Sequence, residues 1–237
     1  MKKSEVSNGI RFALAAIFVV VEIVLYALFL SEDFGSAGVG ANEWLKYSTV
    51  ALAFLFALTH FVFCGKGKDL SDVVLLVLGL ALTLVSDYFL LVKGDYFEIG
   101  LSTFICAQIC YFARIKRGKI WLISSIVVRV LLSVAGIIAL CLTGYGEALY
   151  LLVAVYFVQL VGNFVENVIV AATTKDKTER LNAILLSAGF LLFIGCDISV
   201  GVMNLFGEAG EYIWLFYTPS QVLIALSHWR NNESKTN

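Results

Sequence analysis

The stretch FALAAIFVVVEIVLYALFL (residues 12–30) contains a single charged residue, Glu22, and is otherwise apolar. An α-helix needs about 20 apolar residues to cross the hydrocarbon core of a bilayer. The stretch is too long for the apolar region of a signal peptide, and no A-x-A cleavage pattern follows it. We therefore expect it to form a retained first membrane span.

The composition of the whole chain extends this interpretation. Of its 237 residues, 60% are hydrophobic and 15% are charged. Soluble domains have roughly 45–50% apolar and about 25% charged residues. The mean hydropathy is +0.89 and the formal net charge is −1. These values indicate a multi-pass protein that is surrounded by membrane lipids, for which we expect the bacterial cytoplasmic membrane. They offer no basic domain for a nucleic-acid partner.

Eight apolar segments are long enough to span a membrane. They cover residues 10–30, 43–63, 72–92, 97–115, 120–142, 147–171, 181–203 and 211–229. Backbone groups in lipid must be hydrogen-bonded within the segment, so we expect helices rather than open strands. The sequence thus predicts an all-α protein, with one transmembrane domain over residues 1–237. Short connections make sequential helices antiparallel neighbours.

The positions of the 17 Lys and Arg residues predict the orientation. Cytoplasmic loops of membrane proteins carry an excess of these residues. With both termini inside, the inner ends hold Lys2, Lys3, Arg11, Lys66, Lys68, Arg114, Lys116, Arg117, Lys119, Lys175, Lys177, Arg180, Arg230 and Lys235. The outer side holds only Lys46 and Lys93, and Arg129 lies within a span. The pattern predicts N-in, C-in topology.

Two aspartates interrupt otherwise apolar spans. Asp87 lies in LTLVSDYFLL (residues 82–91), and Asp197 lies in LLFIGCDISV (residues 191–200). An aspartate near the middle of a span costs about 2.5–3.5 kcal/mol on insertion scales, and such residues usually face a cavity or a partner. Both lie at a similar depth, so they can face each other across the bundle. Paired carboxylates can divide the roles of acid and base. The alternative is a hydrogen-bonded pair that only joins helices.

An internal repeat is a second interpretation of these segments. GLALTLVSD (residues 79–87) and GFLLFIGCD (residues 189–197) place glycine and aspartate at the same spacing. Each is followed by a short acidic loop and a helix with a central glutamine. Chance similarity between two Leu- and Gly-rich helices explains the match equally well.

Other polar residues occur inside the spans. Arg129 can pair with Glu166 or Glu22, most simply as a structural ion pair. Asn163 and Asn167 share a face with Glu166 and are typical of hydrogen bonds between membrane helices.

Several residues are candidates to contact a substrate. Lys46 can reach the interface, bind a phosphate, or pair with Asp87 or Asp197. Pro219 must perturb the last helix and open space near its outer end. Four side chains of the fourth and eighth spans are expected to line the interior beside the aspartates: Gln108, Tyr111, Tyr217 and Gln221.

The sequence offers no obvious metal or cofactor site. The five cysteines form no CxxC pair, and histidine occurs only at positions 60 and 228. We therefore expect neither a metal ion nor a cofactor.

These motifs together resemble the YhhN family of lysoplasmalogenases. The matching elements are Leu45-Lys46-Tyr47, Ser86-Asp87, Gly100-Leu101 with Phe104, Gln108 and Tyr111, Cys196-Asp197, and the segment from Tyr217 to Ile224 that contains Gln221. In the family pattern, histidine tends to stand where this chain has Gln108, serine where it has Cys196, and proline after the lysine that corresponds to Lys46.

The resemblance implies eight spans and hydrolysis of the vinyl ether bond of a lysoplasmalogen, a lysophospholipid. Asp87 and Asp197 would form the acid/base pair, and Lys46, Gln108, Tyr111, Tyr217 and Gln221 would contact the substrate. A small membrane transporter, or a lipid-binding protein without turnover, is the alternative that the residues leave open.

Overall fold

A computed structural model describes residues 3–34, 43–64, 70–207 and 210–228. Within them the chain forms α1 (Lys3–Asp33), α2 (Glu43–Cys64), α3 (Leu70–Asp87), α4 (Phe97–Arg114), α5 (Lys119–Leu142), α6 (Ala148–Thr173), α7 (Lys177–Phe206) and α8 (Gly210–Leu226). One π-helical segment, η1 (Tyr88–Lys93), continues α3. The described residues contain no strand, so the all-α prediction is confirmed.

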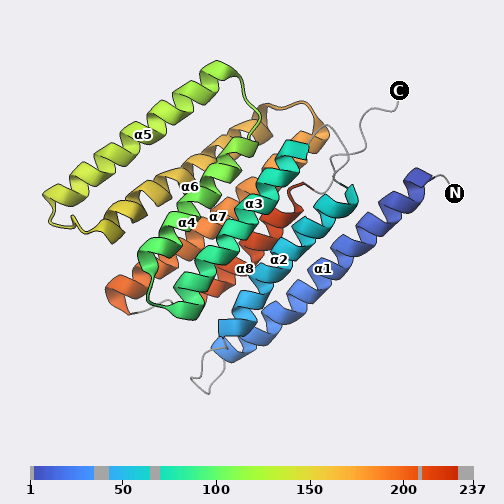
Figure 1. The fold of residues 1–237 in the computed structure, drawn as a ribbon, viewed down its shortest axis with the longest axis horizontal. Helices are drawn as coiled ribbons and strands as arrows, with labels where there is room; N and C mark the ends of the chain where they lie inside the picture. The colour runs from blue at the N-terminus through green and yellow to red at the C-terminus, as the bar shows by residue number, and fades with distance from the viewer. Residues whose placement is uncertain (1–2, 35–42, 65–69, 208–209, 229–237) are drawn as a thin grey trace.

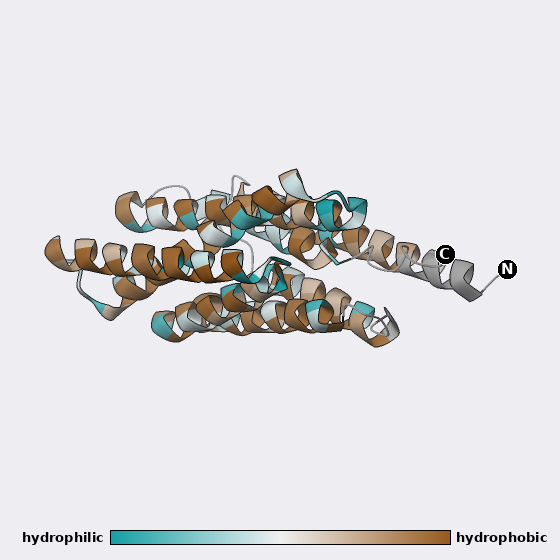
Figure 2. Cartoon of the chain, turned by 90° about the horizontal axis from the view of Figure 1, so that it is seen from above, coloured by the Kyte–Doolittle hydropathy of each residue, from teal (hydrophilic) through white to brown (hydrophobic). Residues whose placement is uncertain are grey.

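Six of these helices are long and apolar enough to cross a membrane: residues Phe12–Asp33, Glu43–Val62, Leu70–Lys93, Lys119–Leu142, Ala148–Thr173 and Lys177–Phe206. Apolar residues run along most of the helices (Figure 2). The protein is therefore an integral membrane protein. The predicted count of eight spans and the N-in, C-in orientation stay predictions, and Lys2, Lys66, Lys68, Arg230 and Lys235 lie outside the described residues.

The helices form a bundle in which sequential helices run antiparallel (Figure 1). α1 lies along one edge, packed on α2 and α8. α5 lies along the opposite edge, packed on α6. The most extensive contacts join α7 with α8 and α3 with α4. These helices therefore position the interior of the bundle, while α5 exposes isoleucine, valine and leucine side chains as expected for contact with lipid.

Two glycines permit close helix packing. A Cβ atom at Gly79 would overlap the Tyr111 ring. At Gly189 it would come within 2.9 Å of Ile224 Cγ1 and 3.1 Å of the Ser220 carbonyl oxygen. The absence of a side chain lets the α4 tyrosine lie against α3 and lets α8 lie against α7.

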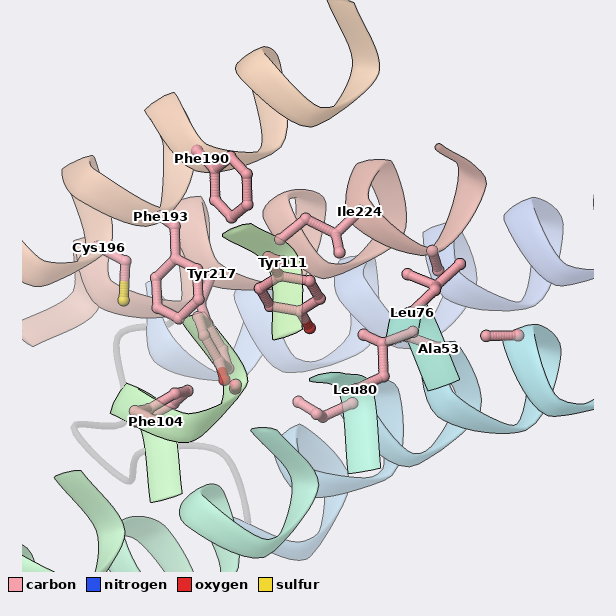
Figure 3. Packing of buried hydrophobic residues seen from close by; sticks show 14 of the residues in the cluster. Ala53, Leu76, Leu80, Phe104, Tyr111, Phe190, Phe193, Cys196, Tyr217 and Ile224 are labelled. Atoms are coloured by element: carbon pink, nitrogen blue, oxygen red, sulfur yellow. The ribbon is translucent and has the colours of Figure 1, made fainter. Parts of the chain in front are cut away.

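The core is a cluster of buried apolar side chains at the centre of the bundle (Figure 3). Leu80, Phe190 and Ile224 are fully buried within it. Phe104, Phe193 and Tyr217 meet toward one end of this cluster (Figure 3). That aromatic group leads to the candidate site.

Candidate functional site

Asp87 is the last residue of α3 before the helix widens into η1. Its side chain is buried, and its Oδ2 atom accepts a hydrogen bond of 2.6 Å from the Tyr217 hydroxyl of α8. The neighbouring Ser86 hydroxyl donates to the carbonyl of Gly100 on α4 at 2.5 Å. The carboxylate is thus held at a junction of α3, α4 and α8.

Asp197 forms a similar pair with a different helix. Its Oδ2 atom accepts a hydrogen bond of 2.8 Å from the Tyr156 hydroxyl of α6. Asp197 is only partly buried, whereas Tyr156 is buried. Each intramembrane aspartate therefore has one tyrosine hydroxyl as its donor.

The two aspartate–tyrosine pairs meet at one aromatic cluster. The Phe193 ring lies 5.2 Å from the Tyr217 ring and 6.5 Å from the Tyr156 ring, measured between centroids. Phe104 lies 5.6 Å from Phe193 and 5.7 Å from Tyr156. The two aspartate–tyrosine pairs therefore flank one aromatic cluster, with Asp87 buried and Asp197 partly exposed.

Lys46 binds a partner that the sequence analysis did not name. Its Nζ atom lies 2.8 Å from the Asp33 carboxylate at the end of α1. The ammonium group also lies 5.8 Å from the centroid of the Trp214 ring, within the range of a cation–π contact. Trp214 is 5.2 Å from Tyr217, which binds Asp87. The lysine is therefore separated from the aspartate site by two aromatic rings.

The remaining predicted site residues lie inside the bundle and form hydrogen bonds with groups other than the two aspartates. Tyr111 lies 3.3 Å from the Thr83 hydroxyl. Gln108 accepts a hydrogen bond of 2.9 Å from Asn163, and Gln221 donates one of 3.3 Å to Ser220. All three predicted residues are at most 1% exposed. The structure thus buries these three side chains in the interior of the bundle. Of the four predicted residues, Tyr217 is joined to an aspartate by a hydrogen bond.

Arg129 pairs with Glu166, one of the two partners that the sequence left open. Its Nη2 atom lies 2.6 Å from Glu166 Oε1. Arg117 and Ser125 also bind this carboxylate, and the Arg129 guanidinium occupies the space that a side chain at Gly162 would fill. Burial lowers the pKa of Arg117 to about 10, so that side chain stays charged at neutral pH. The network joins α5, α6 and the α4–α5 connection, consistent with a structural ion pair.

The predicted hydrogen bonds of the two asparagines are found in part. Asn163 Nδ2 reaches across from α6 to the Gln108 backbone and side-chain oxygens on α4. Asn167 Nδ2 instead donates to the Asn163 carbonyl of its own helix.

A second polar group lies at the other end of the bundle, and the sequence analysis missed it. Asp72 Oδ1 accepts a hydrogen bond of 2.9 Å from Arg114, and Asp72 Oδ2 lies 2.5 Å from His228 Nδ1. Arg114 also donates to Ser227 at 3.1 Å. A cavity of about 60 Å³ borders this group, lined by Asp72, Arg114, Ile115, Lys116, Asn167, Val170, Glu179, Asn182, Ala183, Leu186 and Ser227. Asp72 and Arg114 stand at predicted span ends, where charges usually indicate loops.

The described part of the chain contains no candidate metal-binding site. No group of three His, Cys, Asp or Glu side chains there is arranged to hold a metal ion. The aspartate site consists of only two carboxylates with their tyrosine donors.

The chain matches the model of a known protein family. The family model of the YhhN family matches residues 42–228, a range that begins just before α2 and extends beyond the end of α8. The chain matches no curated protein and no solved structure. The matched range contains both aspartates and both tyrosine donors, whereas α1 precedes it.

Proposed function

Since this chain belongs to the YhhN family, we propose that it is a lysoplasmalogenase-like hydrolase that cleaves the vinyl ether bond of lysoplasmalogens at Asp87 and Asp197. One observation carries the proposal: both intramembrane aspartates are oriented by tyrosine hydroxyls around one aromatic cluster. A carboxylate pair in such a position is suited to proton transfer.

The chemistry requires a proton donor, an anion and one water molecule. One aspartic acid protonates the β-carbon of the vinyl ether, which leaves an oxocarbenium ion at the α-carbon. The other aspartate, ionised, stabilises this cation. Water adds to the cationic carbon and loses a proton to a carboxylate, which restores the acid. The resulting hemiacetal breaks its bond to the glycerol oxygen, which takes up the hydroxyl proton. The products are a fatty aldehyde and a glycerophospho-alcohol.

The aromatic walls of the site suit the cationic intermediate. Ring faces attract cations, and the attraction is stronger where water is excluded. Phe193 contacts both tyrosines, Phe104 packs against Phe193 and Tyr156, and both phenylalanines are buried. The apolar tail of the substrate lies between helices in this arrangement.

Lys46 is our candidate for binding the phosphate of the substrate. Its ammonium group already binds a carboxylate, Asp33, and this ion pair supports an anion-binding role for Lys46. A substrate phosphate would take the place of that carboxylate while the vinyl ether reaches the aspartates beyond Trp214 and Tyr217.

The test uses purified protein with choline and ethanolamine lysoplasmalogens, and it measures free aldehyde. We expect release by the wild type and loss of release in Asp87→Asn and in Asp197→Asn. Asp95→Asn is the matched control, because Asp95 is exposed in the connection between η1 and α4. Full turnover in both intramembrane variants would refute the proposal. Flux of lysolipid into proteoliposomes without aldehyde would instead favour a transporter.

A further inference from the structure

Three buried amides in the centre of the bundle have atoms without a protein partner. These atoms are Gln108 Nε2, Asn163 Oδ1 and Gln221 Oε1. The three side chains are 0%, 0% and 1% exposed. A buried polar group that makes no hydrogen bond is costly, and ordered water is the usual partner where protein groups are lacking. One donor and two acceptors are a suitable set for bound water.

These amides lie one or two helical turns from the aspartate site. Gln221 follows Tyr217 by four residues and Gln108 follows Phe104 by four, so each lies on the same helix face as its aromatic neighbour. Phe104 and Tyr217 both contact Phe193. Gln108 and Gln221 therefore each lie one helical turn from a residue of the aromatic cluster.

The same amides lead to the cavity at the other end of the bundle. Asn163 donates to Gln108 at 2.9 Å, and Asn167 donates to the Asn163 carbonyl at 2.8 Å. Asn167 in turn lines the cavity of about 60 Å³ beside Asp72 and Arg114. A polar connection thus runs from the cavity through Asn167, Asn163 and Gln108 toward the aspartates.

We infer that Gln108, Asn163 and Gln221 bind internal water, and that this water connects the Asp72–Arg114 cavity with the aspartate site and replaces the molecule consumed in each turnover. The second part rests on the proposed function. Water then reaches the site from the end of the bundle opposite Lys46, so the substrate and the water enter from different ends.

Radiolytic hydroxyl-radical labelling tests the first part without any substrate, because it modifies side chains next to bound water. Tyr111 is 1% exposed and lies one turn from Gln108. Phe29 is 0% exposed and is packed against Tyr26 and Trp214, which makes it the matched dry control. We expect Tyr111 to be labelled several-fold faster than Phe29, and Asn163→Leu combined with Gln108→Met to remove the difference. Equal slow labelling of both residues in the wild type would overturn the inference.

Kinetics test the second part. Asn163→Leu should lower kcat about tenfold and leave KM for the lysolipid unchanged. Asn204→Leu, the same change on an exposed position of α7, should leave both constants unchanged. An unchanged kcat in Asn163→Leu, with labelling of Tyr111 lost, would refute the supply of water. If Asp87→Asn stays active while Tyr111 is still labelled, the proposed function fails and the water site stands.

Discussion

The Tyr26 hydroxyl of α1 donates a hydrogen bond of 2.9 Å to the backbone carbonyl of Leu215 in α8. That carbonyl lies four residues before Pro219, which has no N–H group to complete the helical hydrogen bond. A side chain from another helix thus satisfies the group that proline leaves without its usual partner. The contact also joins α1, which precedes the family match, to the helix that carries Tyr217.

Tyr26→Phe should therefore destabilise the protein by about 1–3 kcal/mol, because it leaves a backbone carbonyl without a donor. In a Pro219→Ala background the same substitution should have a much smaller effect, since the alanine N–H restores the helical bond. Thermal unfolding of the four proteins in one detergent forms a double-mutant cycle. Equal effects of Tyr26→Phe in both backgrounds would contradict this account.

Tyr217→Phe and Tyr156→Phe should each lower kcat for vinyl ether cleavage and leave KM nearly unchanged. A hydrogen bond to a charged group contributes about 1.5–3 kcal/mol, equivalent to about ten- to a hundredfold in rate. The matched control is Tyr212→Phe, since Tyr212 is 43% exposed and on the same helix as Tyr217. The effect is measured as the rate of aldehyde release at saturating substrate. An unchanged kcat in both variants would show that the two tyrosine hydroxyls do not contribute to catalysis.

Asp33 and a substrate phosphate should compete for Lys46. Lys46→Met is expected to raise KM with little change in kcat, because it removes binding that is equal in ground and transition states. Asp33→Asn is expected to lower KM by up to about fivefold, the equivalent of about 1 kcal/mol for a partly exposed ion pair. The measurement is KM for the lysolipid, determined by titration in both variants and in the wild type. If Asp33→Asn raised KM, the carboxylate would be orienting the lysine rather than competing for it.

Gly79→Ala should destabilise the α3–α4 pair by about 1–3 kcal/mol, since the added methyl group overlaps the Tyr111 ring. Gly118→Ala is the control, because a Cβ atom there meets no atom within 4 Å. Denaturation midpoints in detergent compare the two variants. Similar midpoints would show that the tyrosine ring moves aside at little cost.

Glu166→Gln should be strongly destabilising, by about 3–5 kcal/mol, because it leaves Arg117 and Arg129 buried without their counter-ion. Glu211→Gln, on the exposed start of α8, should have almost no effect. The loss of stability is measured by thermal unfolding and by the rate of proteolysis in the α4–α5 connection. A Glu166→Gln variant as stable as Glu211→Gln would mean that water or lipid compensates the two arginines.

The sequence predicts the helices well because the length of an apolar run decides whether it crosses a bilayer. The same reasoning identifies Asp87 and Asp197, since a charge inside an apolar run stands out. It also places Tyr217 in the interior beside the aspartates, but it names neither Tyr217 nor Tyr156 as their hydrogen-bond donor. Tyr156 and Tyr217 lie in spans rich in other aromatic residues, and helical periodicity says which face a residue occupies but not which helix it meets.

The sequence also does not predict which charged residues near helix ends bind one another. Asp72, Arg114 and His228 lie at the ends of three different helices, where polar residues normally meet water or headgroups. Only the packing of α3, α4 and α8 shows that they bind one another. The sequence does not predict the Lys46–Asp33 ion pair for the same reason, because Asp33 belongs to an acidic connection in the sequence.

The π-helical segment after Asp87 also bears on how the chain is compared with its relatives. The Gly94 amide bonds to the Phe89 carbonyl, five residues back, so η1 holds more residues per turn than an α-helix. With one residue fewer here, the segment would return to an α-helix and keep both of its ends in place. A deletion before Asp87 would instead turn the aspartate by about 100° around the helix axis and away from Tyr217. We therefore expect gaps in a family alignment to fall within residues 88–93.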